Sequence, residues 1–269
     1  MSAERIERLA GLLATAPKYR NVSPETLSRV AQWAAVRYRS DKEVLKAAKR
    51  KLHQVYAAYL SPKAAARLTQ LDAGSRGDCL EAMSLHASTV ERLPILDELY
   101  GRIFAVTGVP SRVLDLACGL HPFGLPWMGL PAGASYHAMD IDCELMARLG
   151  LFSHRLVAEC RDLLVRPPEE PADLAFLLKA VPCLEQQERG ASLRLLRALN
   201  VRHAVVSFPA HSLGGRSKGM EEHYAAMAEN LIATLGADAE VLRYPSETFY
   251  VIALQRLQRS PDENVPRAL

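Results

Sequence analysis

The stretch that decides the fold is Val113-Leu114-Asp115-Leu116-Ala117-Cys118-Gly119-Leu120-His121-Pro122. Apolar residues lead into an acidic residue, and small residues then form a tight turn. A second apolar run over 135–139 ends at Asp140. Two parallel strands that end in such a turn and such an acidic residue form the pocket of a nucleotide-type cofactor. The dinucleotide fingerprint G-x-G-x-x-G is absent, so the pattern suits S-adenosylmethionine better than NAD.

From residue 111 onward, the chain alternates apolar strand patterns with helical patterns. The expected strands are 112–116, 135–140, 155–159, 173–178, 203–208, 239–244 and 248–256, and the expected helices lie near 142–153, 184–199 and 218–235. Only Pro245-Ser246-Glu247 joins the last two strands, which is too short for a crossover, so these strands are expected to be antiparallel. Five parallel strands followed by a hairpin predict an α/β fold. It is the Rossmann-like seven-stranded sheet of S-adenosylmethionine-dependent methyltransferases.

The first hundred residues lack this alternation and carry helical signals instead. Ser23-Pro24 is a cap followed by proline at the first helical position. Ser88-Thr89-Val90-Glu91 has the spacing of a capping box at the start of a long helix that carries Leu93, Leu96, Leu99 and Ile103. Helices are expected over 3–15, 24–38 and 41–60. The prediction is an N-terminal all-helical domain over 1–106, which binds RNA and links to a methyltransferase domain over 107–269.

Length and charge place limits on the class of protein. The chain has 269 residues, 49% of them hydrophobic, which is enough for a full core and an accessory domain. Residues 1–71 hold 14 Lys and Arg against 5 Asp and Glu. Such a basic front predicts a polyanionic partner such as RNA, although a solvated helix face gives the same count. The candidate phosphate-binding residues are Lys18, Arg20, Lys46, Lys49, Arg50, Lys51, Arg216 and Lys218.

The five cysteines show neither C-x-x-C spacing nor histidines at metal-ligand spacing. No zinc or other metal site and no disulfide framework is therefore expected. The N-terminus has no signal-peptide pattern, and no apolar run reaches about 18 residues. The expectation is a monomeric cytoplasmic protein that does not contact a membrane.

Acidic side chains follow three successive strands. Asp140 is placed to accept hydrogen bonds from two ribose hydroxyls, and Asp162 from an adenine amino group, with Leu163 against the ring. Ala117 and Gly119 let the backbone approach a cofactor closely. One Asp at a strand end equally serves as a turn or cap residue. Three Asp residues at the ends of neighbouring strands, Asp115, Asp140 and Asp162, favour a cofactor site.

Two basic features lie at the same edge of the predicted sheet. Lys179 ends the fourth strand, where methyltransferases of this fold place residues around the target atom. A buried ammonium needs partners, and the alternative is a lysine whose head reaches solvent. The loop 207–220 carries Gly214-Gly215 with Arg216 and Lys218. It fits RNA phosphates or a flipped base, and the alternative is an ordinary connection.

Motifs over nearly the whole chain carry a family resemblance. They are Lys18-Tyr19-Arg20, Lys51-Leu52-His53, Leu85-His86-Ala87-Ser88-Thr89, Glu91-Arg92-Leu93, the 115–122 turn, Leu178-Lys179 through Glu185, Ser207-Phe208-Pro209, Ser212-Leu213-Gly214-Gly215-Arg216 and Lys218-Gly219-Met220. In these motifs the chain resembles the aminoglycoside-resistance 16S ribosomal RNA methyltransferases, in the branch that methylates N7 of guanine 1405. It departs from them at His121, usually Asn, and at Ala210-His211, usually Thr followed by a basic residue.

The resemblance implies a cofactor, a partner and roles for individual residues. The cofactor is S-adenosyl-L-methionine, with Arg92 gripping its carboxylate as a charge-assisted pair. The partner is 16S rRNA within the 30S subunit. Lys179, Glu185 and Arg216 match positions tied to target positioning and catalysis. The implied cofactor-binding residues are Tyr59, His86, Ala87, Ser88, Arg92, Ala117, Gly119, Asp140, Asp162, Leu163, Leu178 and Gln187.

The implied chemistry asks for positioning more than for acid–base groups. Guanine N7 carries no proton, so no general base is needed, and the enzyme must align the reacting atoms. The base is expected to be extruded into the pocket. Two alternatives remain open from the sequence. One is an enzyme of the same fold acting on adenine N1 of the decoding site or on a tRNA base. The other is a non-catalytic RNA-binding module, which would not bind the cofactor.

Overall fold

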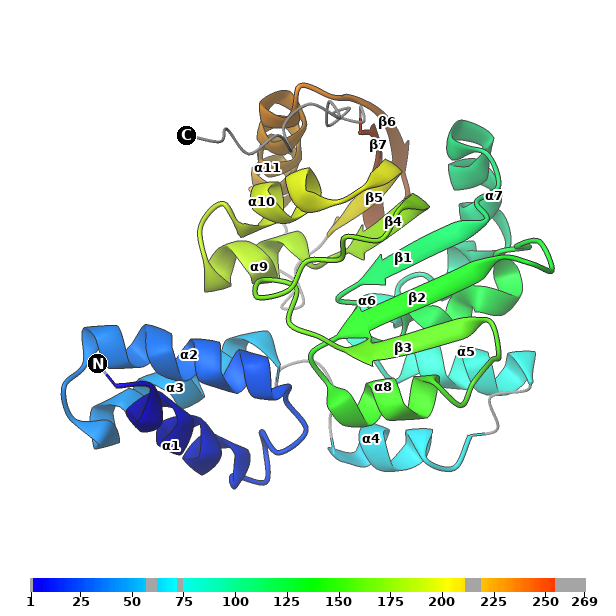
Figure 1. Cartoon of the computed structure of the whole chain (residues 1–269). Helices are drawn as coiled ribbons and strands as arrows, with labels where there is room; N and C mark the ends of the chain where they lie inside the picture. Colours follow the sequence, from blue (N-terminus) through cyan, green and yellow to red (C-terminus); the bar gives the residue numbers. More distant parts are fainter. Residues whose placement is uncertain (1, 57–61, 72–74, 211–218, 255–269) are drawn as a thin grey trace, which may run out of the picture.

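The computed structural model describes residues 2–56, 62–71, 75–210 and 219–254. Its centre is a seven-stranded sheet of order β3-β2-β1-β4-β5-β7-β6 (Figure 1). β1 to β5 are parallel, and β7 is antiparallel to both β5 and β6. The predicted fold is therefore confirmed. The strands are β1 (Arg112–Leu116), β2 (Ser135–Asp140), β3 (Leu156–Cys160), β4 (Ala172–Leu178), β5 (Val201–Pro209), β6 (Asp238–Arg243) and β7 (Glu247–Ala253).

Helices cover both faces of the sheet, so the central strands are continuous apolar runs without polar alternation. One face packs against α5, α7, α8 and η2, and the other against α9, α10 and α11. The helices are α1 (Ala3–Ala14), α2 (Pro24–Arg37), α3 (Asp41–Val55), α4 (Pro62–Leu68), α5 (Arg76–Ser84), α6 (Ala87–Val90), η1 (Leu93–Ile95), α7 (Leu96–Thr107), η2 (His121–Trp127), α8 (Cys143–Leu149), α9 (Val181–Gln187), α10 (Ala191–Ala198) and α11 (Met220–Leu235).

The first three helices form a bundle with a hydrophobic core of its own. Leu9 and Leu13 of α1, Val30 of α2 and Leu52 of α3 are all buried in it. By contrast, α5 and α7 share the core of the sheet. The cores thus separate the α1–α3 bundle from the rest of the described chain. The boundary at residues 106 and 107 between independent domains stays a prediction.

The α1–α3 bundle is attached where β2 ends. Val22 forms an antiparallel bridge with Asp142. The Ser23 N–H donates to the Ile141 carbonyl at 2.8 Å, and the Cys143 N–H donates to the Asn21 carbonyl at 2.8 Å. The bundle therefore lies beyond the carboxyl ends of the parallel strands (Figure 1).

Two local expectations for helices are wrong. Ser88 does not cap the long helix: the His86 side chain caps the short α6, and α7 begins only at Leu96. The single helix expected over 184–199 is two helices, because Gly190 takes a left-handed φ of 78°. The Glu185 carboxylate then accepts the N–H groups of Gly190 (2.7 Å) and Ser192 (2.9 Å) at the start of α10.

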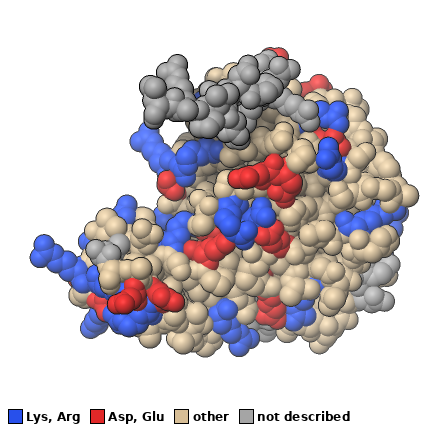
Figure 2. Space-filling view, viewed as in Figure 1, with Lys and Arg blue, Asp and Glu red and all other residues tan. Residues whose placement is uncertain are grey.

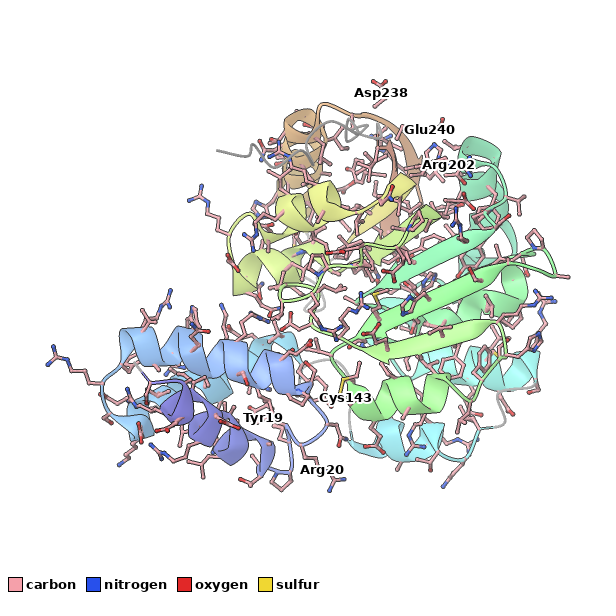
Figure 3. The ribbon with its side chains drawn as sticks, viewed as in Figure 1. Tyr19, Arg20, Cys143, Arg202, Asp238 and Glu240 are labelled. Atoms are coloured by element: carbon pink, nitrogen blue, oxygen red, sulfur yellow. A yellow bond between two sulfur atoms is a disulfide. The ribbon has the colours of Figure 1, made fainter. Side chains whose placement is uncertain are left out.

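The expectation of no disulfide is also wrong. Cys143, at the start of α8, is bonded to Cys160, at the end of β3 (Figure 3). The two cysteines are 17 residues apart in the sequence. They meet because β2 and β3 pair in parallel with Asp140 beside Cys160, which brings the residues following β2 next to the end of β3.

The turn after β1 rests on a buried polar network. The His121 Nδ1 lies 2.9 Å from the Asp115 carboxylate, and its Nε2 lies 3.1 Å from the Tyr100 hydroxyl. The Tyr136 hydroxyl donates to the same carboxylate at 2.7 Å. Asp115 and His121 are each 1% exposed. The unusual His121 is therefore a core residue whose two ring nitrogens both have hydrogen-bond partners. Asp115 supports the turn through its contact with His121.

Candidate active site

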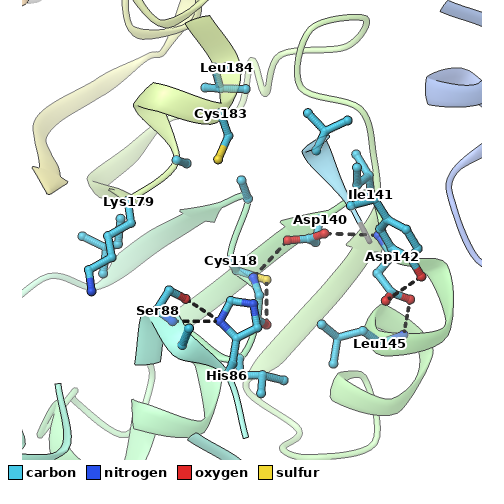
Figure 4. A pocket seen from close by; sticks show the side chains of 18 of the residues that line it. His86, Ser88, Cys118, Asp140, Ile141, Asp142, Leu145, Lys179, Cys183 and Leu184 are labelled. Atoms are coloured by element: carbon cyan, nitrogen blue, oxygen red, sulfur yellow. Dashed lines mark hydrogen bonds between the residues drawn. The ribbon is translucent and has the colours of Figure 1, made fainter. Parts of the chain in front are cut away.

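A cleft of ≈ 1470 Å³ lies between the α1–α3 bundle, α6 and the carboxyl ends of the parallel strands (Figure 4). Pockets for single small ligands have volumes of about 300–1,000 Å³. This cleft therefore has room for a nucleotide-sized ligand and for part of a second molecule. In the close-up, Asp140 and Lys179 lie on opposite sides, with His86 and Ser88 between them.

The backbone is strained at two places on the wall of the cleft. Ala117, after β1, has φ 51°, and Lys179, after β4, has φ 57°. Residues with side chains rarely adopt this region, at a cost on the order of 1–3 kcal/mol, and such residues cluster at functional sites. The Lys179 N–H is held by the Ser207 carbonyl at 3.1 Å and by the Ser207 Oγ at 3.0 Å.

Asp140 ends β2 and presents its carboxylate to the cleft. The Gly119 N–H donates to Oδ2 at 3.0 Å, and the Asp142 N–H donates to Oδ1 at 3.1 Å. Burial raises the pKa of Asp140 to about 6. A carboxylate offers about four acceptor sites, so it retains capacity to accept two neighbouring hydroxyl groups.

His86, which caps α6, and Ser88, which lies in α6, are across the cleft. The Ser88 N–H (3.2 Å) and Oγ (2.6 Å) both lie at the His86 Nδ1. Burial, with the charges of Arg92 and Lys179, lowers the pKa of His86 to about 4. The imidazole is therefore neutral at pH 7. Because Nδ1 accepts the Ser88 N–H, its proton is assigned to Nε2.

Four charged side chains form a network at the side of the cleft near Lys179. Arg92 is 1% exposed and donates from Nε and Nη2 to Glu247, which is 0% exposed. The Lys179 Nζ contacts Glu91 and lies 3.3 Å from the Glu247 carboxylate. The two cations match two carboxylates, so each buried charge has a partner, as burial requires.

Asp162 joins the α1–α3 bundle to the sheet. Its Oδ2 accepts from the Thr26 hydroxyl and from the Arg29 Nε, both at 2.8 Å, and its Oδ1 accepts the Leu164 N–H at 2.9 Å. Arg29 also donates to Gln187 at 2.5 Å. Asp162 lines the cleft as expected, and the protein itself takes three of the roughly four acceptor sites of this carboxylate. Its hydrogen bond to adenine stays a prediction.

The structure brings most of the predicted cofactor residues together. Those that line the cleft are His86, Ala87, Ser88, Arg92, Ala117, Gly119, Asp140, Asp162, Leu163, Leu178 and Gln187. Tyr59 lies outside the described residues. Among the residues predicted to be catalytic, Lys179 lines the cleft, Arg216 lies outside the described residues, and Glu185 does not line the cleft because it caps α10.

The predicted RNA-binding residues occupy the bundle beside the cleft. Lys18 and Arg20 are exposed and line its edge, and Lys46, Lys49 and Arg50 are exposed on α3. Lys51 is partly buried, because its Nζ donates to the Gln186 carbonyl and lies 4.9 Å from the Trp33 ring centre. Lys218 lies outside the described residues. In Figure 2 blue side chains lie over the bundle and near the middle of the same face.

The sequence missed three residues that shape the site: Thr26, Arg29 and Glu247. Thr26 and Arg29 lie on an amphipathic helix, and nothing local shows that they face an acidic residue 133 or more positions away. The sequence predicts Glu247 in the connection between the last two strands, but it is the first residue of β7. Its one visible signal is an acidic residue directly before an apolar run.

Two general features of the described part of the chain also bear on function. Among those residues, no group of three or more His, Cys, Asp or Glu side chains has a metal-binding arrangement. In the same residues, no helix combines the length and apolar character needed to cross a membrane.

Comparison with known proteins gives consistent matches. The family described as "Ribosomal RNA methyltransferase (FmrO)" matches residues 15–251. A 16S rRNA (guanine(1405)-N(7))-methyltransferase from Micromonospora rosea is 39% identical over 93% of this chain and 97% of its own. One from Serratia marcescens is 41% identical over 83% of this chain and 88% of its own. The crystal structure of the 16S rRNA methyltransferase RmtF with S-adenosyl-L-homocysteine superposes with a TM-score of 0.82, at 36% identity, over 95% of this chain and 100% of that chain.

The contact between Thr26 and Asp162 gives a test of how the bundle is attached. T26V keeps the shape but removes the hydroxyl that donates to a buried carboxylate, so we expect the free energy of unfolding to fall by about 1–3 kcal/mol. The control is T234V, whose exposed hydroxyl donates to the Asn230 carbonyl within its own helix. Denaturant unfolding measures both. Equal stability of T26V and the unmodified protein would contradict the role given to this contact.

Proposed function

The chain belongs to the FmrO family of ribosomal RNA methyltransferases, and from this premise we propose its reaction. It is a 16S rRNA (guanine(1405)-N(7))-methyltransferase that uses S-adenosyl-L-methionine. One observation supports placing this reaction in the cleft. Asp140, the left-handed Ala117 and the left-handed Lys179 all line the same cavity. The relatives that share this activity also favour guanine 1405 over an adenine or a tRNA base.

The residues of the cleft fit the proposed cofactor. Asp140 accepts hydrogen bonds from the ribose hydroxyls, and the turn at Ala117 and Gly119 lets the backbone come close. His86 and Ser88 border the methionine end. In the described part of the chain no hydrogen bond of Arg92 uses Nη1, so this nitrogen is assigned to the cofactor carboxylate while Glu247 holds the other two.

When bound, the cofactor supplies a methyl group, which N7 takes by its lone pair as the carbon–sulfur bond breaks and its electrons return to sulfur. N7 has no proton to lose, so the protein's contribution is alignment and exclusion of water. Lys179 borders the part of the cleft beyond the methionine end, where the extruded base would enter. Glu185 is assigned an indirect role, because it fixes the junction of α9 and α10.

We assign RNA docking to the bundle. Lys18, Arg20 and the basic residues of α3 neutralise phosphates, and Arg216 and Lys218, in the sequence between β5 and α11, add to the positive charge. The proposed substrate is 16S rRNA folded within the 30S subunit, because a bundle that reads phosphates and shape suits a preassembled surface. We also propose that the protein acts as a monomer in the cytoplasm.

Methyl transfer is tested with labelled S-adenosylmethionine and purified bacterial 30S subunits, with naked 16S rRNA in parallel. We expect label at one site, mapped to guanine 1405 by strand cleavage specific for N7-methylguanine. D140A is the matched inactive control, because it removes the ribose acceptor. Label at another base would contradict the target, and no label on either substrate would contradict the reaction.

The product predicts a cellular effect. Methylation at N7 adds a positive charge and blocks a hydrogen-bond acceptor on the major-groove edge of the base. We expect bacteria that express this chain to resist aminoglycosides of the 4,6-disubstituted class, whose amino groups bind there. Inhibitory concentrations are measured for cells expressing the chain or its D140A variant. Equal values for the two would contradict the proposal.

Asp140 predicts how cofactor affinity depends on pH. The ionised carboxylate accepts the ribose hydroxyls, so binding below a pKa of about 6 requires loss of a proton. Affinity is expected to fall by about tenfold between pH 7 and pH 5. His86, with a pKa of about 4, stays neutral over this range. Calorimetry with S-adenosylhomocysteine measures the effect, and D140N should bind weakly with a flat profile. A pH-independent affinity of the unmodified protein would contradict this.

A further inference from the structure

Glu247 is a fully buried carboxylate beside the cleft, and the reaction proposed above assigns it no part in methyl transfer beyond holding Arg92. It is 0% exposed and accepts three hydrogen bonds from the Arg92 guanidinium at 2.8–3.1 Å. The Ser207 hydroxyl also donates to it. Replacing a buried ion pair by apolar residues is often neutral or stabilising, so stability alone does not explain such a group.

Two separate contacts lead from Glu247 to Lys179. The first acts on the side chain, because the Lys179 Nζ lies 3.3 Å from the Glu247 Oε2. The second acts on the backbone through Ser207, whose Oγ donates to Glu247 and accepts the Lys179 N–H at 3.0 Å. That N–H belongs to the residue with φ 57°. One carboxylate therefore contacts the Lys179 ammonium directly and the strained Lys179 backbone through Ser207.

Glu247 is itself held in a fixed place. It is the first residue of β7, opposite Pro209 at the end of β5. Just before it, the Ser246 hydroxyl donates to the Glu91 carbonyl at 2.8 Å, and the Ser246 carbonyl accepts the Ala210 N–H at 2.9 Å. The tip of the β6–β7 hairpin is thus tied to α6 and to β5, so the Glu247 carboxylate has a defined position relative to the cleft.

The ammonium of Lys179 lies between an inner and an outer carboxylate. Its side chain is 9% exposed, that of Glu247 is 0% exposed, and that of Glu91 is 31% exposed and lines the cleft. Because Arg92 balances Glu247, the network leaves no unpaired buried charge. With Glu91 as its one partner, the Lys179 ammonium could move together with that partly exposed side chain. The buried Glu247 keeps the ammonium at the end of β4.

We propose that Glu247 is a positioning residue for methyl transfer, which fixes Lys179 through its ammonium and, with Ser207, through its backbone. The proposal rests on the function proposed above and adds a residue to it. A displacement of about 1 Å at a reacting centre can cost a hundredfold in rate. Loss of the Glu247 charge should therefore lower the rate of methyl transfer, even when the cofactor and RNA are saturating.

The test compares single-turnover methylation of 30S subunits by the full chain and its E247Q and S207A variants. We expect E247Q to lower the rate by at least about tenfold and S207A by less, because S207A removes only the backbone contact. E240Q is the matched control, since Glu240 is an exposed carboxylate on the adjacent strand β6 (Figure 3). It should leave the rate unchanged. Thermal unfolding of each variant monitors folding.

A double-mutant cycle separates positioning from general loosening of the fold. If Glu247 acts through Lys179, the double variant E247Q/K179M should be no slower than K179M. Once the Lys179 ammonium is gone, the loss of the Glu247 charge has nothing further to misplace. Losses that multiply, or an E247Q rate equal to that of the unmodified chain, would overturn the proposal. Should E247Q fail to fold, the same cycle with S207A and K179M decides. If the unmodified chain transfers no methyl group, the proposed function has failed and not this inference.

Discussion

The attachment of the α1–α3 bundle to the ends of β2 and β3 is the constraint on which the site depends. Backbone hydrogen bonds join residues 21–23 to residues 141–143, and Thr26 and Arg29 bind the buried Asp162. Without this attachment, Asp140 would stand at an open sheet edge, as strand ends do in other parallel sheets. With it, the same edge becomes one wall of a closed-in cleft, and the basic residues proposed to dock on RNA are held beside it.

A second constraint acts from the opposite side of the cleft. The network of Glu91, Arg92, Lys179 and Glu247 connects α6 to β4 and β7. Its charges balance within the protein, so the interior tolerates them at low dielectric. Lys179, which we place at the target, is therefore held by α6 and β7, and the segment that follows Asp140, which we place at the cofactor, is held by the bundle. A reaction that needs alignment more than proton transfer is served by this kind of rigidity.

Much of the architecture could be predicted because it follows from local pattern. The bounds of β1 and β2 match the predicted ranges residue for residue, since buried apolar runs and the turn at 115–122 mark them clearly. The hairpin of β6 and β7 followed from a connection too short for a crossover. The break at Gly190 was missed, because its cap comes from Glu185 five residues earlier and an apolar helical pattern continues through it.

The site was predictable only in part. Residues that carry a motif, such as Asp140 and Lys179, were found, and the structure brings them to one cleft. The partners of Asp162, which are Thr26 and Arg29, were not found, because local sequence spacing does not reveal contacts between residues more than a hundred positions apart. The disulfide was missed for a different reason: its cysteines are 17 residues apart, and they meet through the register of β2 and β3, which cysteine spacing does not reveal.

The most direct test of the account is a crystal structure of the full chain with S-adenosyl-L-homocysteine. The account predicts the ligand in the cleft between the bundle and the sheet, with its ribose hydroxyls on the Asp140 carboxylate. Its carboxylate should meet the Arg92 Nη1, and its sulfur should face the side of the cleft where Lys179 lies. A ligand bound elsewhere, or bound in the cleft without contact to Asp140, would contradict the account.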